Sequence, residues 1–348
     1  MKNISRILSR QSHRVFHRRQ FPTISHSPPI SQKIHTTSVH PANGAKNKIR
    51  DPITKSTMTT MYQHGPSASE FARTYNDRTG GCNIRLATHL IALVKPYLPP
   101  TTAASAAEPL RILDNACGPL VLTNAILHDE DIKAYANVHI SAVDFNEAFI
   151  ENNQGIIDAM EYRKGVTIQT AVMNGMDLKF PDDVFDVSFT SLGIFAFPDP
   201  VKGARELYRT LKPGGVAALT TWKRVGWVSF LHEVERRVRP GEALTQFPFL
   251  EAWSVPGKLA ETLREGGFGD VVEDEVVSYA WFEGEEGAAR SLSETVEMLV
   301  GRNWGEGGKE KMYEGLRRGM EGGSELMRRG DGGKVGFEMV AWTGVGRK

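Results

Sequence analysis

Five short apolar runs alternate with helical segments between residues 110 and 222, and this alternation constrains the fold more than any other feature. Each run is short and rich in β-branched or other apolar residues, which is typical of a strand buried in a parallel sheet. Helical patterns separate the runs. We therefore predict a doubly wound α/β fold with helices on both faces of a mostly parallel sheet. The runs are LRILDNA, HISAVDF, VTIQTAV, FDVSFTSL and GVAALTTW, and the helical segments are 120–134, 147–163 and 200–211.

Further elements are predicted on both sides of this alternating region. Residues 66–98 predict two helices that are separated at Gly80-Gly81. After the fifth run, GKLAETLREGGF predicts a short amphipathic helix, and DVVEDEVVSYA and GFEMVAWTGVG predict a final antiparallel pair of strands. We assign residues 61–348 to one domain, in which 222–256 and the helical, Gly-rich stretch 281–334 are insertions on the substrate side.

The charge of the chain is divided unevenly. Residues 1–50 contain ten Lys and Arg and no Asp or Glu, although the whole chain has 42 basic and 41 acidic residues. The remainder is therefore acidic, with 32 basic against 41 acidic residues. Such a body is a poor candidate for binding nucleic acid through its phosphates. We expect a small-molecule partner; nothing in the sequence predicts the oligomeric state.

The first 60 residues resemble a targeting sequence that directs a protein into an organelle. Arg6, Arg10, Arg14 and Arg18 recur at four-residue spacing, with apolar residues between them and no acids. This pattern is typical of a mitochondrial transit peptide, followed by a Pro/Ser/His-rich linker. The alternative is a basic tail with translation starting at Met58 or Met61, which would leave the protein in the cytoplasm.

Two further classes are excluded by composition. No apolar run approaches the roughly 18–20 residues of a membrane span. The two cysteines, Cys82 and Cys117, provide neither a disulfide framework nor a cysteine-based zinc site. No other ligand cluster predicts a metal.

The turn after the first apolar run predicts a ligand without phosphates. ILDNACGPL has Ala116, Gly118 and Leu120 where a dinucleotide site needs glycines for close approach of the pyrophosphate. S-adenosylmethionine fits, because its amino-acid end can meet Asp114 and the turn backbone. Asp144, which ends the second run, can accept both ribose hydroxyls with its two oxygens. The alternative is an ordinary strand end, with Asp144 as a helix cap.

Longer stretches resemble the class I S-adenosylmethionine-dependent methyltransferases, and among these the fungal small-molecule enzymes of the gliotoxin thiomethyltransferase type. They occur in family order over roughly residues 66–348 and are most specific from Phe185 to Trp222. The resemblance implies a Rossmann-like sheet of seven strands that ends in a reversed hairpin. The stretches are ILDNACGPL, AVDFNEAF, MNGMDLKFPDDVFDVSF, SLGIFAFPDPVKGARELYRTLKPGGVAALTTWKRVGW and VAWTGVGRK.

The same resemblance implies a set of cofactor contacts. Leu120 and Asn174 depart from the family pattern, which often has an acidic residue in place of Asn174. Carried over by position, the turn at the methionine end comprises Asp114, Asn115, Ala116 and Gly118; the ribose and adenosine residues are Asp144, Phe145 and Asn146; the adenine residues are Asn174, Gly175 and Met176; and Ser191, Leu192 and Gly193 face the methyl donor and the substrate.

Methyl transfer from a sulfonium is an in-line displacement, so the enzyme mainly aligns the reactants and excludes water. His232 is the candidate base for an acidic acceptor such as a thiol or phenol; the alternative is a packing histidine. Phe195, Trp222 and Trp227 follow strand ends and predict an aromatic wall for a flat or apolar acceptor. The resemblance adds Tyr75 as part of a lid.

The sequence therefore predicts methyl transfer to S, O or N of a secondary metabolite or xenobiotic. C-methylation in quinone biosynthesis is a second enzyme hypothesis, which the transit-like segment favours. A third is a cofactor-binding regulator or assembly factor without turnover. A nicotinamide dehydrogenase is least favoured, because the first turn lacks the necessary glycines.

Overall fold

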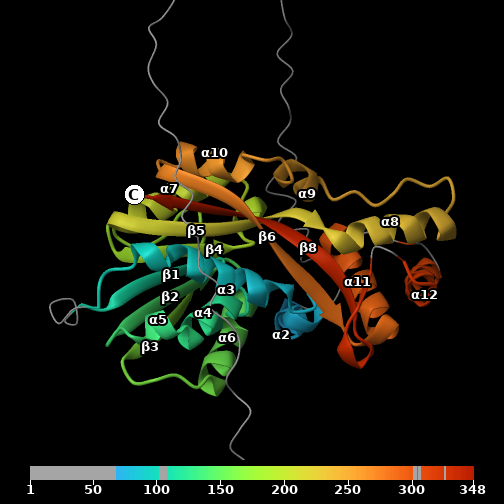
Figure 1. The fold of residues 1–348 in the computed structure, drawn as a ribbon, viewed down its shortest axis with the longest axis horizontal. Coiled ribbons are helices and arrows are strands. Elements are labelled where there is room, and N and C mark those ends of the chain that lie inside the picture. The colour runs from blue at the N-terminus through green and yellow to red at the C-terminus, as the bar shows by residue number, and fades with distance from the viewer. Residues whose placement is uncertain (1–67, 102–107, 301–303, 305–306, 325–326) are drawn as a thin grey trace, which may run out of the picture. The chain divides into compact units, whose positions relative to one another are not determined.

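The computed structural model describes residues 68–348 except 102–107, 301–303, 305–306 and 325–326. The predicted transit-like segment 1–60 lies outside the described residues. Within the described chain, one sheet has the strand order β3-β2-β1-β4-β5-β8-β6, and a short β7 pairs with β8 (Figure 1). The strands are β1 Leu110–Asn115, β2 Val138–Asp144, β3 Val166–Val172, β4 Phe185–Ser191, β5 Leu211–Val225, β6 Gly269–Phe282, β7 Arg328–Arg329 and β8 Val335–Arg347.

The strand directions confirm the predicted fold class. Strands β1 to β5 pair in parallel, whereas β8 lies antiparallel between β5 and β6. The seven-strand path and the reversed final pair agree with the expectation, and the two-residue β7 is an addition to it. The carboxyl ends of β1, β2 and β4 meet at one edge of the sheet, where ligands bind in folds of this class.

Helices cover both faces of the sheet. Successive side chains of β1 point to opposite faces of the sheet. Ile112 packs in the apolar layer under α3, α4 and α5, and Leu113 packs in the layer under α7, α9 and α10. The helices are α2 Ala68–Arg78, α3 Cys82–Val94, α4 Val121–His128, α5 Glu130–Lys133, α6 Glu147–Ala159, α7 Pro200–Thr210, α8 Gly226–Val238, α9 Pro248–Trp253, α10 Lys258–Glu265, α11 Gly284–Val300 and α12 Gly308–Glu321.

Two local predictions were wrong. The helix expected over 120–134 is two helices, because the carboxylate of Asp129 accepts from the backbone N–H groups of Asp131 and Ile132 and starts a new helix there. The run VTIQTAV forms β3 but is not buried, since it is the edge strand and its residues are half-buried or exposed.

The turn between α2 and α3 is fixed against β6. Gly80 has φ +58°, and a Cβ atom there would lie 2.6 Å from the backbone nitrogen of Trp281. The same nitrogen donates to the carbonyl of Gly80 at 2.8 Å. Glycine is therefore required by both conformation and space, and this turn determines where α2 lies.

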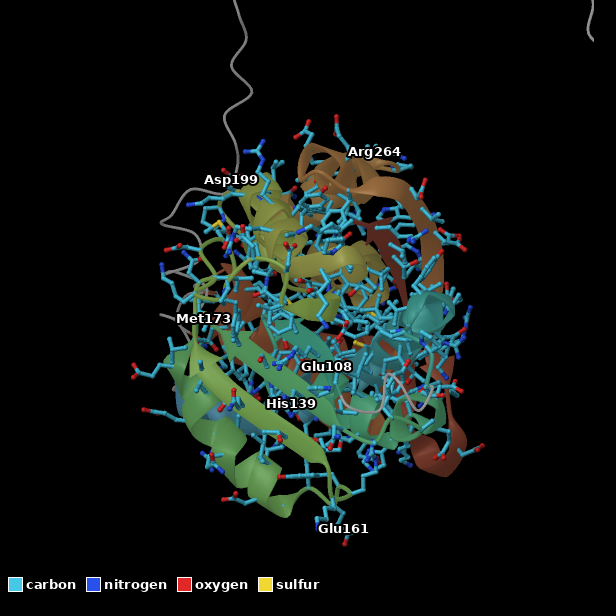
Figure 2. The ribbon with its side chains drawn as sticks, turned by 90° about the vertical axis from the view of Figure 1, so that its left-hand side faces the viewer. Glu108, His139, Glu161, Met173, Asp199 and Arg264 are labelled. Atoms are coloured by element: carbon cyan, nitrogen blue, oxygen red, sulfur yellow. The ribbon has the colours of Figure 1, made fainter. Side chains whose placement is uncertain are left out.

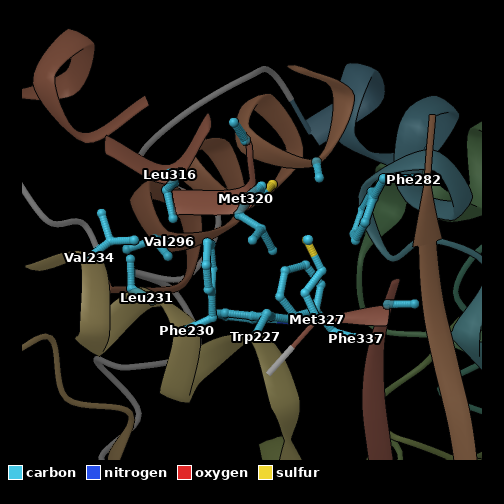
Figure 3. Packing of buried hydrophobic residues seen from close by; sticks show 14 of the residues in the cluster. Trp227, Phe230, Leu231, Val234, Phe282, Val296, Leu316, Met320, Met327 and Phe337 are labelled. Carbon is cyan, nitrogen blue, oxygen red and sulfur yellow. The ribbon is translucent and has the colours of Figure 1, made fainter. Parts of the chain in front are cut away.

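A second apolar core lies beyond the end of the parallel strands. The long strands β6 and β8 extend toward α8, α11 and α12 (Figure 1). Phe230 of α8 and Phe337 of β8 are fully buried, with ring centroids 5.4 Å apart, and α12 covers them with Met320 and Leu316 (Figure 3). The segments 222–256 and 281–334 thus share one core, which supports the structure on that side of the sheet.

Candidate cofactor and substrate site

The turn after β1 has an unusual backbone. Ala116, Gly118 and Leu120 all have positive φ, at 58°, 49° and 62°. A non-glycine residue in this region costs about 1–2 kcal/mol, so the surrounding structure must hold the turn in place. The Leu120 side chain is completely buried with Cys117, Ala142 and Ile157. Leucine at this position therefore contributes to the core between β2 and α6.

Gly118 is held on both sides of its backbone. The carboxylate of Asp144 accepts from its N–H at 2.9 Å, and the side-chain amide of Asn153 donates to its carbonyl at 2.9 Å. The other oxygen of Asp144 accepts from the N–H of Asn146, which also caps α6. Burial raises the pKa of Asp144, and these backbone N–H groups oppose that rise. Asn153 was missed by sequence reasoning, because an asparagine within a helix carries no signal of its partner.

Asp114 lies behind the turn. Its carboxylate accepts from the hydroxyl of Thr123 in α4 at 2.7 Å, and it is only 1% exposed. Burial raises the pKa of Asp114 to about 7, which the Thr123 hydrogen bond opposes and the nearby Asp144 carboxylate increases. The structure therefore assigns Asp114 a contact within the protein, where it joins β1 to α4.

The loop after β3 reaches the same edge of the sheet. The N–H of Met173 donates to the carbonyl of Asp144 at 2.8 Å, and the side chain of Asn174 accepts from the N–H of Met176 at 3.0 Å. A Cβ on Gly175 would lie 2.7 Å from the side-chain oxygen of Asn115. Figure 2 shows Met173 and Asp199, at the beginning of α7, on the same side of the molecule.

The residues after β4 lie against the first turn. Leu192 has φ +56°, and its N–H donates to the hydroxyl of Thr220 at 3.0 Å. The Ser191 and Thr220 hydroxyls are 3.4 Å apart. A Cβ on Gly193 would lie 2.5 Å from the Cβ of Ala116, so the absence of a side chain there makes room for Ala116. The structure thus brings the four predicted cofactor segments to one edge.

The residues at this edge fit the expected cofactor. Nδ2 of Asn115, which is 1% exposed, has no hydrogen-bond partner among the described residues. A buried donor needs an acceptor, and a bound molecule can supply one here. A Cβ on Gly118 would meet no heavy atom within 4 Å, so there is free space beside the turn. Phe145, at the end of β2, is exposed and can cover a bound base.

An aromatic cavity of about 180 Å³ adjoins the cofactor edge. Leu192 belongs to both, since it follows β4 and lines the cavity. All four predicted substrate residues line the cavity: Tyr75, Phe195, Trp222 and Trp227. Phe249 of α9 stacks on Phe195 with a centroid distance of 5.6 Å, and Phe282 and Leu299 come from the stretch 281–334. Both insertions therefore supply walls of this cavity.

Tyr75 connects the cavity with the cofactor edge. Its hydroxyl accepts from the side-chain amide of Asn83 at 3.0 Å, and its ring meets Phe149 of α6 edge-on. Burial raises the pKa of Tyr75, and the charge of Asp144 raises it further. The phenol therefore stays protonated at neutral pH.

An ion pair in the cavity wall was missed by sequence reasoning. Arg78 lines the cavity and pairs with Glu294 of α11. The two residues are 216 positions apart, so no local pattern relates them.

His232 lies on α8, outside the lining of the aromatic cavity. Its Nε2 is 2.7 Å from the carbonyl oxygen of Thr245. A carbonyl only accepts, so this nitrogen carries the proton in the observed contact.

In the part of the chain described, no group of three or more His, Cys, Asp or Glu residues could hold a metal ion. No helix there is both long and apolar enough to span a bilayer.

A model of the ubiE/COQ5 methyltransferase family matches residues 100–230, which run from before β1 into α8. The chain is 27% identical over 132 residues to the methyltransferase tpcH of Aspergillus fumigatus, covering 38% of this chain and 46% of that protein. It is 30% identical over 182 residues to a demethylmenaquinone methyltransferase of Symbiobacterium thermophilum, covering 45% and 67%. The chain thus spans about half the length of the Aspergillus relative.

Among solved structures, the chain is similar to phosphoethanolamine N-methyltransferase 2 of Haemonchus contortus in complex with phosphomonomethylethanolamine and S-adenosylhomocysteine. The identity is 16%, the TM-score is 0.41, and the match covers 75% of this chain and 52% of that one.

Proposed function

We propose that this chain, which belongs to the ubiE/COQ5 methyltransferase family, transfers a methyl group from S-adenosylmethionine to a sulfur, oxygen or nitrogen atom of a small aromatic or apolar molecule. The observation that carries the proposal is that Leu192 borders both the cofactor edge and the aromatic cavity. It follows β4 at the cofactor edge and also lines the aromatic cavity. An acceptor in the cavity therefore faces the edge where the donor would bind.

The chain's own residues divide the work of binding. Asp144 would accept from the ribose hydroxyls, and Nδ2 of Asn115 would donate to an acceptor on the amino-acid part. The loops after β3 and β4 would border the base and the sulfonium. When bound, S-adenosylmethionine supplies an electrophilic methyl group on a sulfonium. The aromatic walls hold the acceptor, exclude water and stabilise the nearby positive charge.

A calorimetric titration tests the cofactor part of the proposal. The full chain is titrated with S-adenosylmethionine, S-adenosylhomocysteine and NAD, together with Asp144→Ala and the exposed α6 control Asp158→Ala. We expect micromolar binding of both sulfur ligands, loss of that binding in Asp144→Ala only, and no binding of NAD. Failure of folded wild-type protein to bind either sulfur ligand would refute the proposal.

A panel of thiols, phenols and amines then tests the acceptor. Fungal small-molecule specificity of the thiomethyltransferase type predicts methylation of dithiols in this panel. If the protein binds S-adenosylmethionine but methylates no acceptor of any class, the regulator or assembly hypothesis takes first place.

C-methylation of a quinone precursor is the second candidate. The match to a demethylmenaquinone methyltransferase favours it, because that alignment covers 182 residues, whereas the alignment with tpcH covers 132. A quinone ring system is of the size that the cavity holds, whereas a polyprenyl tail would have to lie outside it. Methylation of a demethylated quinone at carbon, with no product from the S, O or N panel, would replace the first proposal with this one.

The subcellular location of the protein is a separate proposal. We propose that residues 1–60 direct it to mitochondria, on the basis of their acid-free arginine spacing. Fusion of residues 1–60 to a fluorescent protein, with a second fusion in which Arg6, Arg10, Arg14 and Arg18 are changed to Gln, tests this by fractionation. An equally cytoplasmic distribution of both fusions would contradict it.

A further inference from the structure

Arg78 is the one charged side chain among the described residues that line the aromatic cavity. The side chain is 9% exposed. Its Nη1 pairs with the carboxylate of Glu294, and its Nε donates to the hydroxyl of Thr74 at 2.7 Å. Neither contact uses Nη2, so this nitrogen can donate to an oxygen of a molecule in the cavity.

The ion pair makes the wall polar without giving it a net charge. A buried guanidinium requires a partner, and Glu294 provides the compensating negative charge. A carboxylate bound at the same guanidinium would lie close to the carboxylate of Glu294 in a poorly solvated place, where like charges repel strongly. A neutral oxygen would accept the hydrogen bond without that repulsion.

We infer that Arg78 and Glu294 together determine the charge of the acceptor, so that the cavity selects a compact neutral aromatic molecule with a hydrogen-bonding oxygen, such as a phenol or ketone, over an aromatic carboxylate. The inference rests on the proposed function for the identity of this cavity as the acceptor site. The size of the molecule follows from the volume of about 180 Å³. A dry protein cavity of about 150 Å³ holds benzene, so this cavity suits one or two rings.

Two probes of equal ring size test the inference. Binding of 2-naphthol and 2-naphthoate to the full-length wild-type chain is followed by tryptophan fluorescence, because Trp222 and Trp227 line the cavity. The variants are Glu294→Gln and the control Glu286→Gln. Gln at 294 keeps an oxygen for Arg78 but removes the charge. Glu286 lies on the same helix and pairs with Arg290, with both side chains mostly exposed.

We expect the wild type and Glu286→Gln to bind 2-naphthol at least about tenfold more tightly than 2-naphthoate, and Glu294→Gln to lose about tenfold of that preference. Equal affinities or a preference for 2-naphthoate in the wild type would overturn the inference, and this comparison needs no variant to fold. An unchanged preference in folded Glu294→Gln would overturn it as well.

The cofactor titration keeps the two proposals apart. If S-adenosylmethionine binds but neither naphthalene does, the inference about the cavity fails and the cofactor proposal stands. If the naphthol preference is found but S-adenosylmethionine does not bind, the cavity inference stands and the methyltransferase proposal fails.

Discussion

The side-chain amide of Asn153 lies 2.9 Å from the carbonyl oxygen of Gly118, although the two residues are 35 positions apart. Asp144 holds the N–H of the same glycine. One residue of the first turn is therefore attached to both the end of β2 and the middle of α6. This attachment keeps the turn in its left-handed conformation.

Replacement of Asn153 by Ala should release the turn. We expect the free energy of unfolding to fall by about 1–3 kcal/mol, because a partly buried carbonyl loses its donor. Affinity for S-adenosylhomocysteine should fall as well, since Gly118 would be held only through its N–H by Asp144. Urea unfolding and calorimetry measure the two effects. The exposed neighbour Glu151→Ala is the control, and an Asn153→Ala protein that behaves like it would show that the turn does not depend on this hydrogen bond.

The buried carboxyl of Asp114 should make stability depend on pH. Its pKa is about 7 in the folded protein against 3.8 for the ordinary group. Between these values the folded state binds more protons than the unfolded state, so the free energy of unfolding falls as pH rises toward 7 and levels off above it. The full penalty above pH 7 is up to about 4 kcal/mol.

Asp114→Asn should remove this penalty while keeping a neutral side chain that accepts from Thr123. We expect Asp114→Asn to match the wild type in acid, near the lower end of this interval, and to be more stable than the wild type at pH 8. Chemical unfolding across this range measures the difference. The exposed Glu161→Gln serves as control. A constant difference between Asp114→Asn and wild type at all pH values would contradict the expectation.

Glycine should have opposite effects at two positions of the first turn. Ala116→Gly removes only a methyl group from a residue with positive φ, so we expect unchanged or slightly raised stability, by about 1 kcal/mol at most. Leu120→Gly relieves similar strain but removes a completely buried side chain, so we expect a net loss of about 1–3 kcal/mol. Thermal unfolding of both variants tests the contrast, which would be wrong if Leu120→Gly were as stable as Ala116→Gly.

His232 can be tested by a substitution that keeps its hydrogen bond. The side-chain amide of Gln can donate to the Thr245 carbonyl but cannot act as a base at neutral pH. Since His232 lies outside the cavity lining, we expect His232→Gln to retain most of the wild-type kcat toward an acceptor found in the panel. A loss of about a hundredfold or more, with normal cofactor affinity, would instead identify His232 as the base.

The parallel core of the fold could be predicted from the sequence because its signals are local. Apolar runs and the stop at Gly80-Gly81 each act over a few residues. The predicted cofactor segments also meet, since the carboxyl ends of parallel strands share an edge. The exposure of β3 could not be predicted, because an edge strand and a central strand can have the same composition.

Features that depend on distant contacts were not predictable. Arg78 and Glu294 are joined by the packing of α2 on α11, and the two residues are 216 positions apart in the sequence. Leu120 was predicted from the sequence only to prevent close approach of a pyrophosphate, and its side chain packs with Ile157 of α6. In both cases the sequence supplies the residue type, and only tertiary packing supplies the direction of its side chain.

Because of the position of β8, the order in which the strands can pair differs from the order in which they are synthesised. β8 is made after β5 and β6 but lies between them and pairs with both. While a ribosome is still translating the segments before residue 335, two long strands present unpaired edges with no partner yet available. The sheet is therefore completed only when β8 has emerged. A nascent chain that stops before that point lacks the hydrogen bonds by which β8 joins β5 to β6.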